Sequence, residues 1–136
     1  MNLSQRPELV VKGNLVDAER VTPDGWLAIA GGKIIGSGSG QAPEAPQGID
    51  AGGKWILPGV IDGQGHSGSQ ANQEGLGWAS RAAAAGGITV MVDMPYDDPQ
   101  PVACRALLEA KIAEVERDCH VDVALFGTLN ATYGFD

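Results

Sequence analysis

Gln64 and His66 are the residues whose types and spacing most suggest chemistry. They are two positions apart, so on an extended strand their side chains point to the same side. An imidazole nitrogen is a good ligand for zinc and related metals, whereas glutamine offers only a neutral carbonyl oxygen. The pair predicts a metal site with one strong and one weak ligand. The alternative is that His66 is an ordinary structural histidine.

Further polar side chains directly follow short apolar segments that are expected to be strands. In α/β folds, residues at the carboxyl ends of parallel strands form the ligand sites. Asp62 and Asp93 are expected either to orient a metal-bound histidine through a hydrogen bond or to cap a following turn or helix. Tyr96 and Asn130 are candidate pocket residues, although Tyr96 could also simply pack. His120 precedes its strand, at the opposite end, and is expected to be structural.

The first part of the chain predicts short strands and tight turns. Residues 9–11 and 15–16 are β-prone, with a turn expected at Gly13-Asn14. Residues 26–29 and 33–35 flank Gly31-Gly32, which predicts a hairpin. Residues 36–48 are rich in Gly, Ser and Pro and are expected to be a loop, without the spacing of a phosphate-binding loop. One more strand is expected at 55–57.

After Pro58 the pattern changes to an alternation of strands and helices. Strands are expected at 60–61, 88–92 and 121–126. A helix is expected from Gln73 to Ala85, with Asn72 as its N-cap and Gly86-Gly87 as its end. A second helix is expected to open at Asp97-Asp98-Pro99. This order predicts an α/β fold with a parallel sheet.

Charge and composition exclude several classes of function. The 136 residues carry 17 acidic and 9 basic side chains, a net charge of −8, which argues against nucleic acid or an anionic membrane as a partner. Cys104 and Cys119 are expected at opposite ends of one helix, beyond disulfide reach, as free thiols of a reducing compartment. No signal peptide or membrane span is recognised, so the cytoplasm is the expected location.

Several ordered segments together resemble the cyclic amidohydrolase group, which comprises dihydroorotase, allantoinase and hydantoinase-like members of the amidohydrolase superfamily. Residues 9–37 resemble that group's N-terminal β-strands. The other matching segments are Lys54 to Asp62, Ser80 to Thr89, Val92-Asp93-Met94-Pro95 and His120 to Leu125. The resemblance implies the first three β/α units of a (β/α)₈ barrel in residues 58–136, preceded by part of a small β-sandwich in residues 1–57.

The resemblance also implies hydrolysis of a ring amide bond in a small cyclic amide or ureide, assisted by Zn²⁺ or another divalent metal. The group's members bind metal with a His-x-His pair, whose second position is His66 and whose first falls on Gln64. This departure leaves open one metal ion in place of two, a different chemistry or an inactive relative. Dihydroorotases also carry an Arg that binds the substrate carboxylate and an Asn after Met-Pro, where this chain has Ser67-Gly68 and Tyr96.

The remaining ligands implied by the resemblance belong to later barrel strands, and we do not expect them in this chain, which ends near the third strand. It is therefore expected to be a truncated part, inactive alone, with no catalytic residue of its own. It would be completed by a homo-oligomer or by the rest of the barrel. The alternative function is a catalytically impaired relative that acts as an interaction or assembly module.

Overall fold

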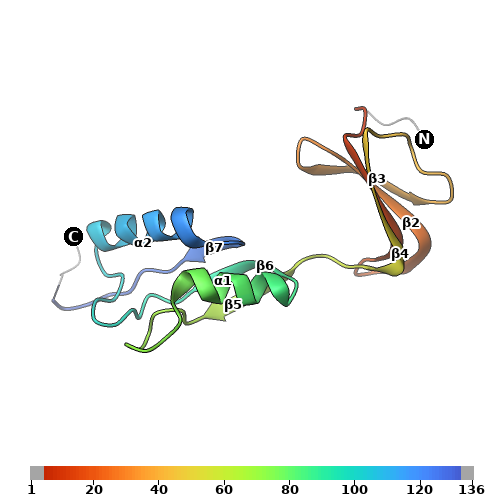
Figure 1. The fold of residues 1–136 in the computed structure, drawn as a ribbon. Helices are drawn as coiled ribbons and strands as arrows, with labels where there is room; N and C mark the ends of the chain where they lie inside the picture. The colour runs from red at the N-terminus through yellow and green to blue at the C-terminus, as the bar shows by residue number, and fades with distance from the viewer. Residues whose placement is uncertain (1–4, 133–136) are drawn as a thin grey trace. The chain divides into compact units, whose positions relative to one another are not determined.

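The computed structural model describes residues 5–132 and divides into two compact units, one extending to Pro58 and the other starting at Gly59. Figure 1 shows the order of elements, with β1 to β4 in the first unit and β5, α1, β6, α2 and β7 in the second. No helix within the described range is long and apolar enough to cross a membrane.

The first unit is a single four-stranded sheet. Its strands are β1 (Leu9–Val16), β2 (Val21–Ala30), β3 (Lys33–Ser39) and β4 (Gln47–Ile56), arranged in the order β3-β2-β1-β4. The β1–β2 and β2–β3 pairs are antiparallel, whereas β1 and β4 are parallel. A small core of Val10, Trp26 and Ala28 forms on one face, and Ile35, Ala42 and Ala45 pack against it.

The hairpin predicted around Gly31-Gly32 is confirmed. These two residues connect β2 to β3 with φ angles of 55° and 70°. Two consecutive positive φ values are what a tight two-residue hairpin requires, and glycine adopts them without a Cβ clash.

Two expectations for this unit were wrong. No turn breaks the chain at Gly13-Asn14; β1 runs through both residues, and its pairing with β2 shifts register there instead. The expected loop at 36–48 is also too long, because β3 continues to Ser39 and β4 begins at Gln47. Backbone pairing with neighbouring strands overrides the low β-propensity of this Gly/Ser-rich sequence.

The second unit is a parallel α/β layer, which confirms the predicted class. Its elements are β5 (Val60–Gly65), α1 (Gly75–Ala85), β6 (Ile88–Asp93), α2 (Arg105–Asp118) and β7 (Asp122–Leu125). The strands lie in the order β5-β6-β7, and both neighbouring pairs are parallel. Helix α1 contacts β6 and α2. The loops that follow β5, β6 and β7 start at the carboxyl ends of the three strands.

Both helices begin later than predicted. Helix α1 starts at Gly75 with Glu74 at its N-cap and no side-chain cap, so Asn72 does not cap it. Helix α2 starts at Arg105 after Cys104, not at 97–99. The Asp97 carboxylate binds Lys111 and does not cap a helix.

The predicted helix end at Gly86-Gly87 is confirmed. The Gly86 N–H donates to Ala82 and Ala83 carbonyls, and Gly87 has a φ of 83°. A glycine with positive φ just after a helix is a common stop. Cys104 and Cys119 flank α2 and are free cysteines, as expected.

Candidate functional site at the carboxyl ends of β5 and β6

His66 lies directly after β5 and is exposed. Its Nδ1 lies 2.9 Å from the Ser69 hydroxyl oxygen, a contact that orients the ring. With Nδ1 engaged in this way, a ligand would bind the imidazole through Nε2. The position after a parallel strand is the one predicted for a ligand-binding histidine.

Gln64 is exposed at the end of β5. Its backbone N–H donates to Oδ1 of Asp62 at 3.1 Å. This bond between residues two apart is a local turn contact. It is the kind of contact expected if Asp62 caps a turn, one of the two roles considered for this residue.

Tyr96 follows β6 and faces the same region as His66. The two ring centroids are 6.5 Å apart, and the ring planes differ by 14°. Tyr96 is 56% exposed, so much of its surface remains accessible. The two neighbouring loops therefore present two nearly parallel rings at the carboxyl end of the sheet.

Asp93, the last residue of β6, is almost completely buried. Its Oδ1 accepts a hydrogen bond from the backbone N–H of Ser67 at 3.0 Å. Its Oδ2 lies 3.2 Å from the Lys111 ammonium, as an ion pair without a well-directed hydrogen bond. Asp93 thus contacts the backbone of the residue after His66, whereas the two roles considered for it were to orient a histidine ring and to cap a turn or helix.

Lys111 on α2 is a buried cation that the sequence did not single out. Its side chain is 6% exposed, and Nζ donates to Asp97 Oδ2 at 2.7 Å. Burial pulls the pKa of Lys111 down, but the hydrogen bond to Asp97 and the charges of Asp93 and Asp97 outweigh it, and the pKa is raised. The ammonium is therefore charged at neutral pH, between two carboxylates.

The remaining candidates, Asn130 and His120, each take part in a hydrogen bond that involves the backbone. Asn130 Oδ1 accepts the N–H of Thr132 at 2.8 Å, a turn contact. The backbone N–H of His120 donates to Ser80 Oγ at 3.2 Å, in keeping with the expected structural role. Lys111 was missed because a lysine in a charged helix gives no signal of burial, and Asp97 because its acidic neighbour and proline resembled a helix start.

The donors found here do not make a complete zinc site. Within residues 5–132 no group of three or more His, Cys, Asp and Glu side chains is placed to hold a metal ion. Structural zinc takes four ligands and catalytic zinc takes three from the protein. Gln64 and His66 supply two at most, so the part of the chain that the structure describes holds no complete set of zinc ligands.

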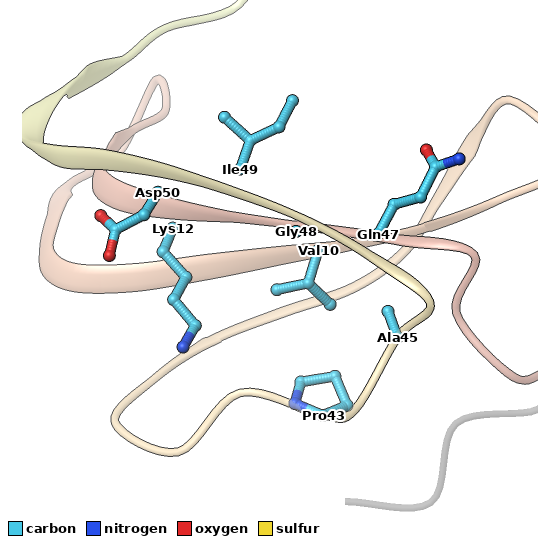
Figure 2. A pocket seen from close by; sticks show the side chains of 8 residues that line it. All are labelled: Val10, Lys12, Pro43, Ala45, Gln47, Gly48, Ile49 and Asp50. Carbon is cyan, nitrogen blue, oxygen red and sulfur yellow. The ribbon is translucent and has the colours of Figure 1, made fainter.

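A separate hollow of about 320 Å³ lies in the first unit, between β1, β4 and the segment that precedes β4. Figure 2 shows Val10, Lys12, Pro43 and Ala45 on one side of the strands, with Gln47 and Ile49 pointing to the other. Its lining holds no histidine, cysteine or hydroxyl group.

Known proteins similar in sequence to this chain include allantoinases. An allantoinase of Escherichia coli (strain K12) is 33% identical over 133 residues, which is 95% of this chain and 28% of the relative. The chain thus spans less than a third of the length of the curated relatives it matches. No family model matches the chain.

Solved structures share the fold. D-hydantoinase (dihydropyrimidinase) from Thermus sp. superposes with a TM-score of 0.68 at 20% identity, covering 88% of this chain and 27% of that one. N-acyl-D-glutamate deacylase from Bordetella bronchiseptica, solved with zinc and a phosphonate inhibitor, superposes with a TM-score of 0.62 at 20% identity. The match covers 90% of this chain and 30% of the deacylase chain.

Proposed function

We propose, from the premise that this chain belongs to the cyclic amidohydrolase group, that it forms part of an enzyme that hydrolyses a C–N bond of a small cyclic amide or ureide. The observation that carries the proposal is the 33% identity to an allantoinase over 95% of the chain. The site geometry supports it, because His66 and Tyr96 lie at the sheet edge where such folds bind substrate.

The architecture proposed with this function is a metal-dependent (β/α)₈ barrel. Residues 58–136 would supply three of its strands, β5, β6 and β7, and residues 1–57 would supply part of a β-sandwich. The parallel β5-β6-β7 order and the likeness to D-hydantoinase support this architecture. An open parallel sheet leaves strand edges unpaired, which a closed barrel removes.

The cofactor proposed is a single divalent ion, with zinc as the first candidate. His66 would be its strong ligand and Gln64 a weak one, and the other ligands would come from outside the described residues. Such an ion lowers the pKa of a bound water and polarises a carbonyl. The roles of this chain's own residues are narrower: Ser69 orients the His66 ring, and Tyr96 offers a flat surface beside it.

The substrate proposed is an uncharged ring, of the allantoin or hydantoin kind, in preference to dihydroorotate. A dihydroorotase-like carboxylate-binding arginine would stand at Ser67-Gly68, but Ser67 is buried. A Cβ on Gly68 would lie 3.0 Å from the Asp97 carboxylate. Without an arginine at this point an anionic substrate is disfavoured, whereas the His66 and Tyr96 rings suit a planar neutral one.

The test is ring opening by tagged protein isolated from the cells that make it, so that any polypeptide completing the fold is retained. Allantoin, hydantoin, dihydrouracil and dihydroorotate would be compared with and without added zinc. We expect turnover of one of the first three, reduced at least about 100-fold in His66→Ala and unaffected in His120→Ala. Absence of turnover with all four rings, or full activity in His66→Ala, would refute the proposal.

A further inference from the structure

The buried ammonium of Lys111 is the feature that the proposed function leaves unexplained. Helix α2 is otherwise a charged, largely exposed helix, and Lys111 is its one buried residue. Lysine is almost never fully buried unless its charge is paired. Here the pairing partners are not on α2 alone: Asp93 belongs to β6 and Asp97 to the loop that follows it.

The two acceptors connect Lys111 to both loops of the candidate site. Asp93 accepts the N–H of Ser67, which immediately follows His66. Asp97 immediately follows Tyr96, and its carboxylate lies beside Gly68. Lys111 is thus linked to the His66 loop through Asp93 and Ser67, and to the Tyr96 loop through Asp97, the residue next to Tyr96.

Backbone hydrogen bonds also join the two loops. Met94 donates to the Gly65 carbonyl at 2.8 Å, and Asp98 donates to the Gly68 carbonyl at 2.9 Å. These bonds hold the loops after β5 and β6 together, but they also bring two carboxylates into one buried region. Without a cation there, Asp93 and Asp97 would repel each other, and one would lose its charge or leave.

We infer that Lys111 is a positioning residue, which fixes the loop carrying His66 against the loop carrying Tyr96 by pairing with both Asp93 and Asp97. Lys111 contacts neither ring and acts through the two carboxylates. The inference rests on the proposed function, since it concerns the geometry of the site that contains His66 and Tyr96. The raised pKa of Lys111 agrees with it, because a positioning cation must remain charged.

The test compares Lys111→Met with Lys111→Arg and with Arg105→Met, a control on the same helix whose side chain is 90% exposed. The readouts are the NMR signals and hydrogen-exchange rates of the Ser67 amide and the ring signals of His66. In Lys111→Met we expect the Ser67 amide to exchange at least about tenfold faster, and the His66 ring signals to shift. Amides of β7 should change less, Lys111→Arg should restore the parent values, and Arg105→Met should leave them unchanged.

If Lys111→Met does not fold, the double variant Lys111→Met/Asp97→Asn keeps the net charge of the cluster and is measured in its place. Unchanged Ser67 and His66 signals in a folded variant would overturn the inference. Faster exchange spread evenly over all strands would also overturn the inference, and so would failure of both variants to fold. Either result would mean that Lys111 has a purely structural role. No substrate enters these measurements, so absence of hydrolysis would count against the proposed function alone.

Discussion

The carboxylate of Asp93 accepts a hydrogen bond from the backbone N–H of Ser67, at 3.0 Å, in a buried setting. The bond joins the end of β6 to the residue that follows His66, 26 positions earlier in the chain. A buried carboxylate shared between a backbone donor and a buried ammonium is costly to disturb, because removing any partner leaves an unpaired polar group.

Asp93→Ala should destabilise the protein more than Asp93→Asn. The alanine removes both the acceptor for Ser67 and the counter-charge for Lys111, which should cost about 3 kcal/mol. The asparagine keeps an oxygen for the Ser67 N–H and should cost about 1–2 kcal/mol. Urea unfolding measures both values, and equal losses would contradict the view that the backbone bond matters in its own right.

Lys111 should make stability fall at high pH. Its pKa is raised in the folded protein, against about 10.4 in an unfolded chain. The folded state therefore holds the proton more tightly, so this stabilisation is complete below the unfolded pKa and is lost as pH rises through the folded pKa. The charges that face Lys111 are those of Asp93, Asp97 and Glu114.

The measurement is the free energy of unfolding from pH 7 to 12, for the parent protein and for Lys111→Arg. Arginine stays charged over that range, so the part of the alkaline decline due to Lys111 should be absent from the variant. Other groups titrate equally in both proteins and cancel in the difference. Identical curves would show that Lys111 does not contribute.

Replacing Gln64 by histidine should strengthen zinc binding. An imidazole is a far better zinc ligand than a neutral amide oxygen, and position 64 is exposed beside His66. We expect Gln64→His to raise zinc affinity by at least about tenfold, measured by competition with a chromogenic chelator. His66→Ala should lower the affinity and His120→Ala should leave it unchanged; no response to either change at 64 or 66 would exclude the pair as ligands.

Gly38→Ala should destabilise the first unit. A Cβ at Gly38 would lie 2.7 Å from Cζ2 of the buried Trp26, and overfilling of this kind typically costs about 1–3 kcal/mol. Gly48→Ala is the matched control in the same sheet, since its Cβ meets nothing nearer than 4.0 Å. Urea unfolding followed by tryptophan fluorescence distinguishes them, and equal midpoints would contradict the prediction.

Cys119 should react slowly with thiol reagents. Burial raises the pKa of its thiol, although a hydrogen bond with Ser80 lowers it in part. A smaller fraction is therefore thiolate at neutral pH, and the thiolate is the reactive form. In Cys104→Ser, which leaves Cys119 as the one thiol, labelling with a disulfide reagent should be slower in the native protein than in denaturant. Equal labelling rates in the native and the denatured protein would contradict a raised pKa of the Cys119 thiol.

The sequence sufficed for features that depend on neighbouring residues. The hairpin at Gly31-Gly32 follows from glycine's access to positive φ, and the helix end at Gly86-Gly87 follows from the same freedom. The strand and helix alternation after Pro58 was equally visible, because it is a pattern of local hydrophobicity.

Features that depend on distant pairing could not be predicted. Asp97 has the composition of a helix start, but Lys111, 14 positions later, binds its carboxylate. The burial of Lys111 has no signature in the sequence, since the adjacent charges of α2 suggest a solvent-exposed helix. The site was therefore predicted through His66, Gln64 and Tyr96, while the charges that hold its loops became visible only in the structure.

The parallel pairing of β1 with β4 has a consequence for the order in which the first unit can form. As the polypeptide is synthesised, β1, β2 and β3 can pair once Ser39 has emerged, because each joins its sequence neighbour. One edge of β1 then stays open until β4 arrives, and an open edge invites wrong partners. Only three residues separate β4 from β5, so β4 emerges, and can close this edge, just before the second unit starts to emerge.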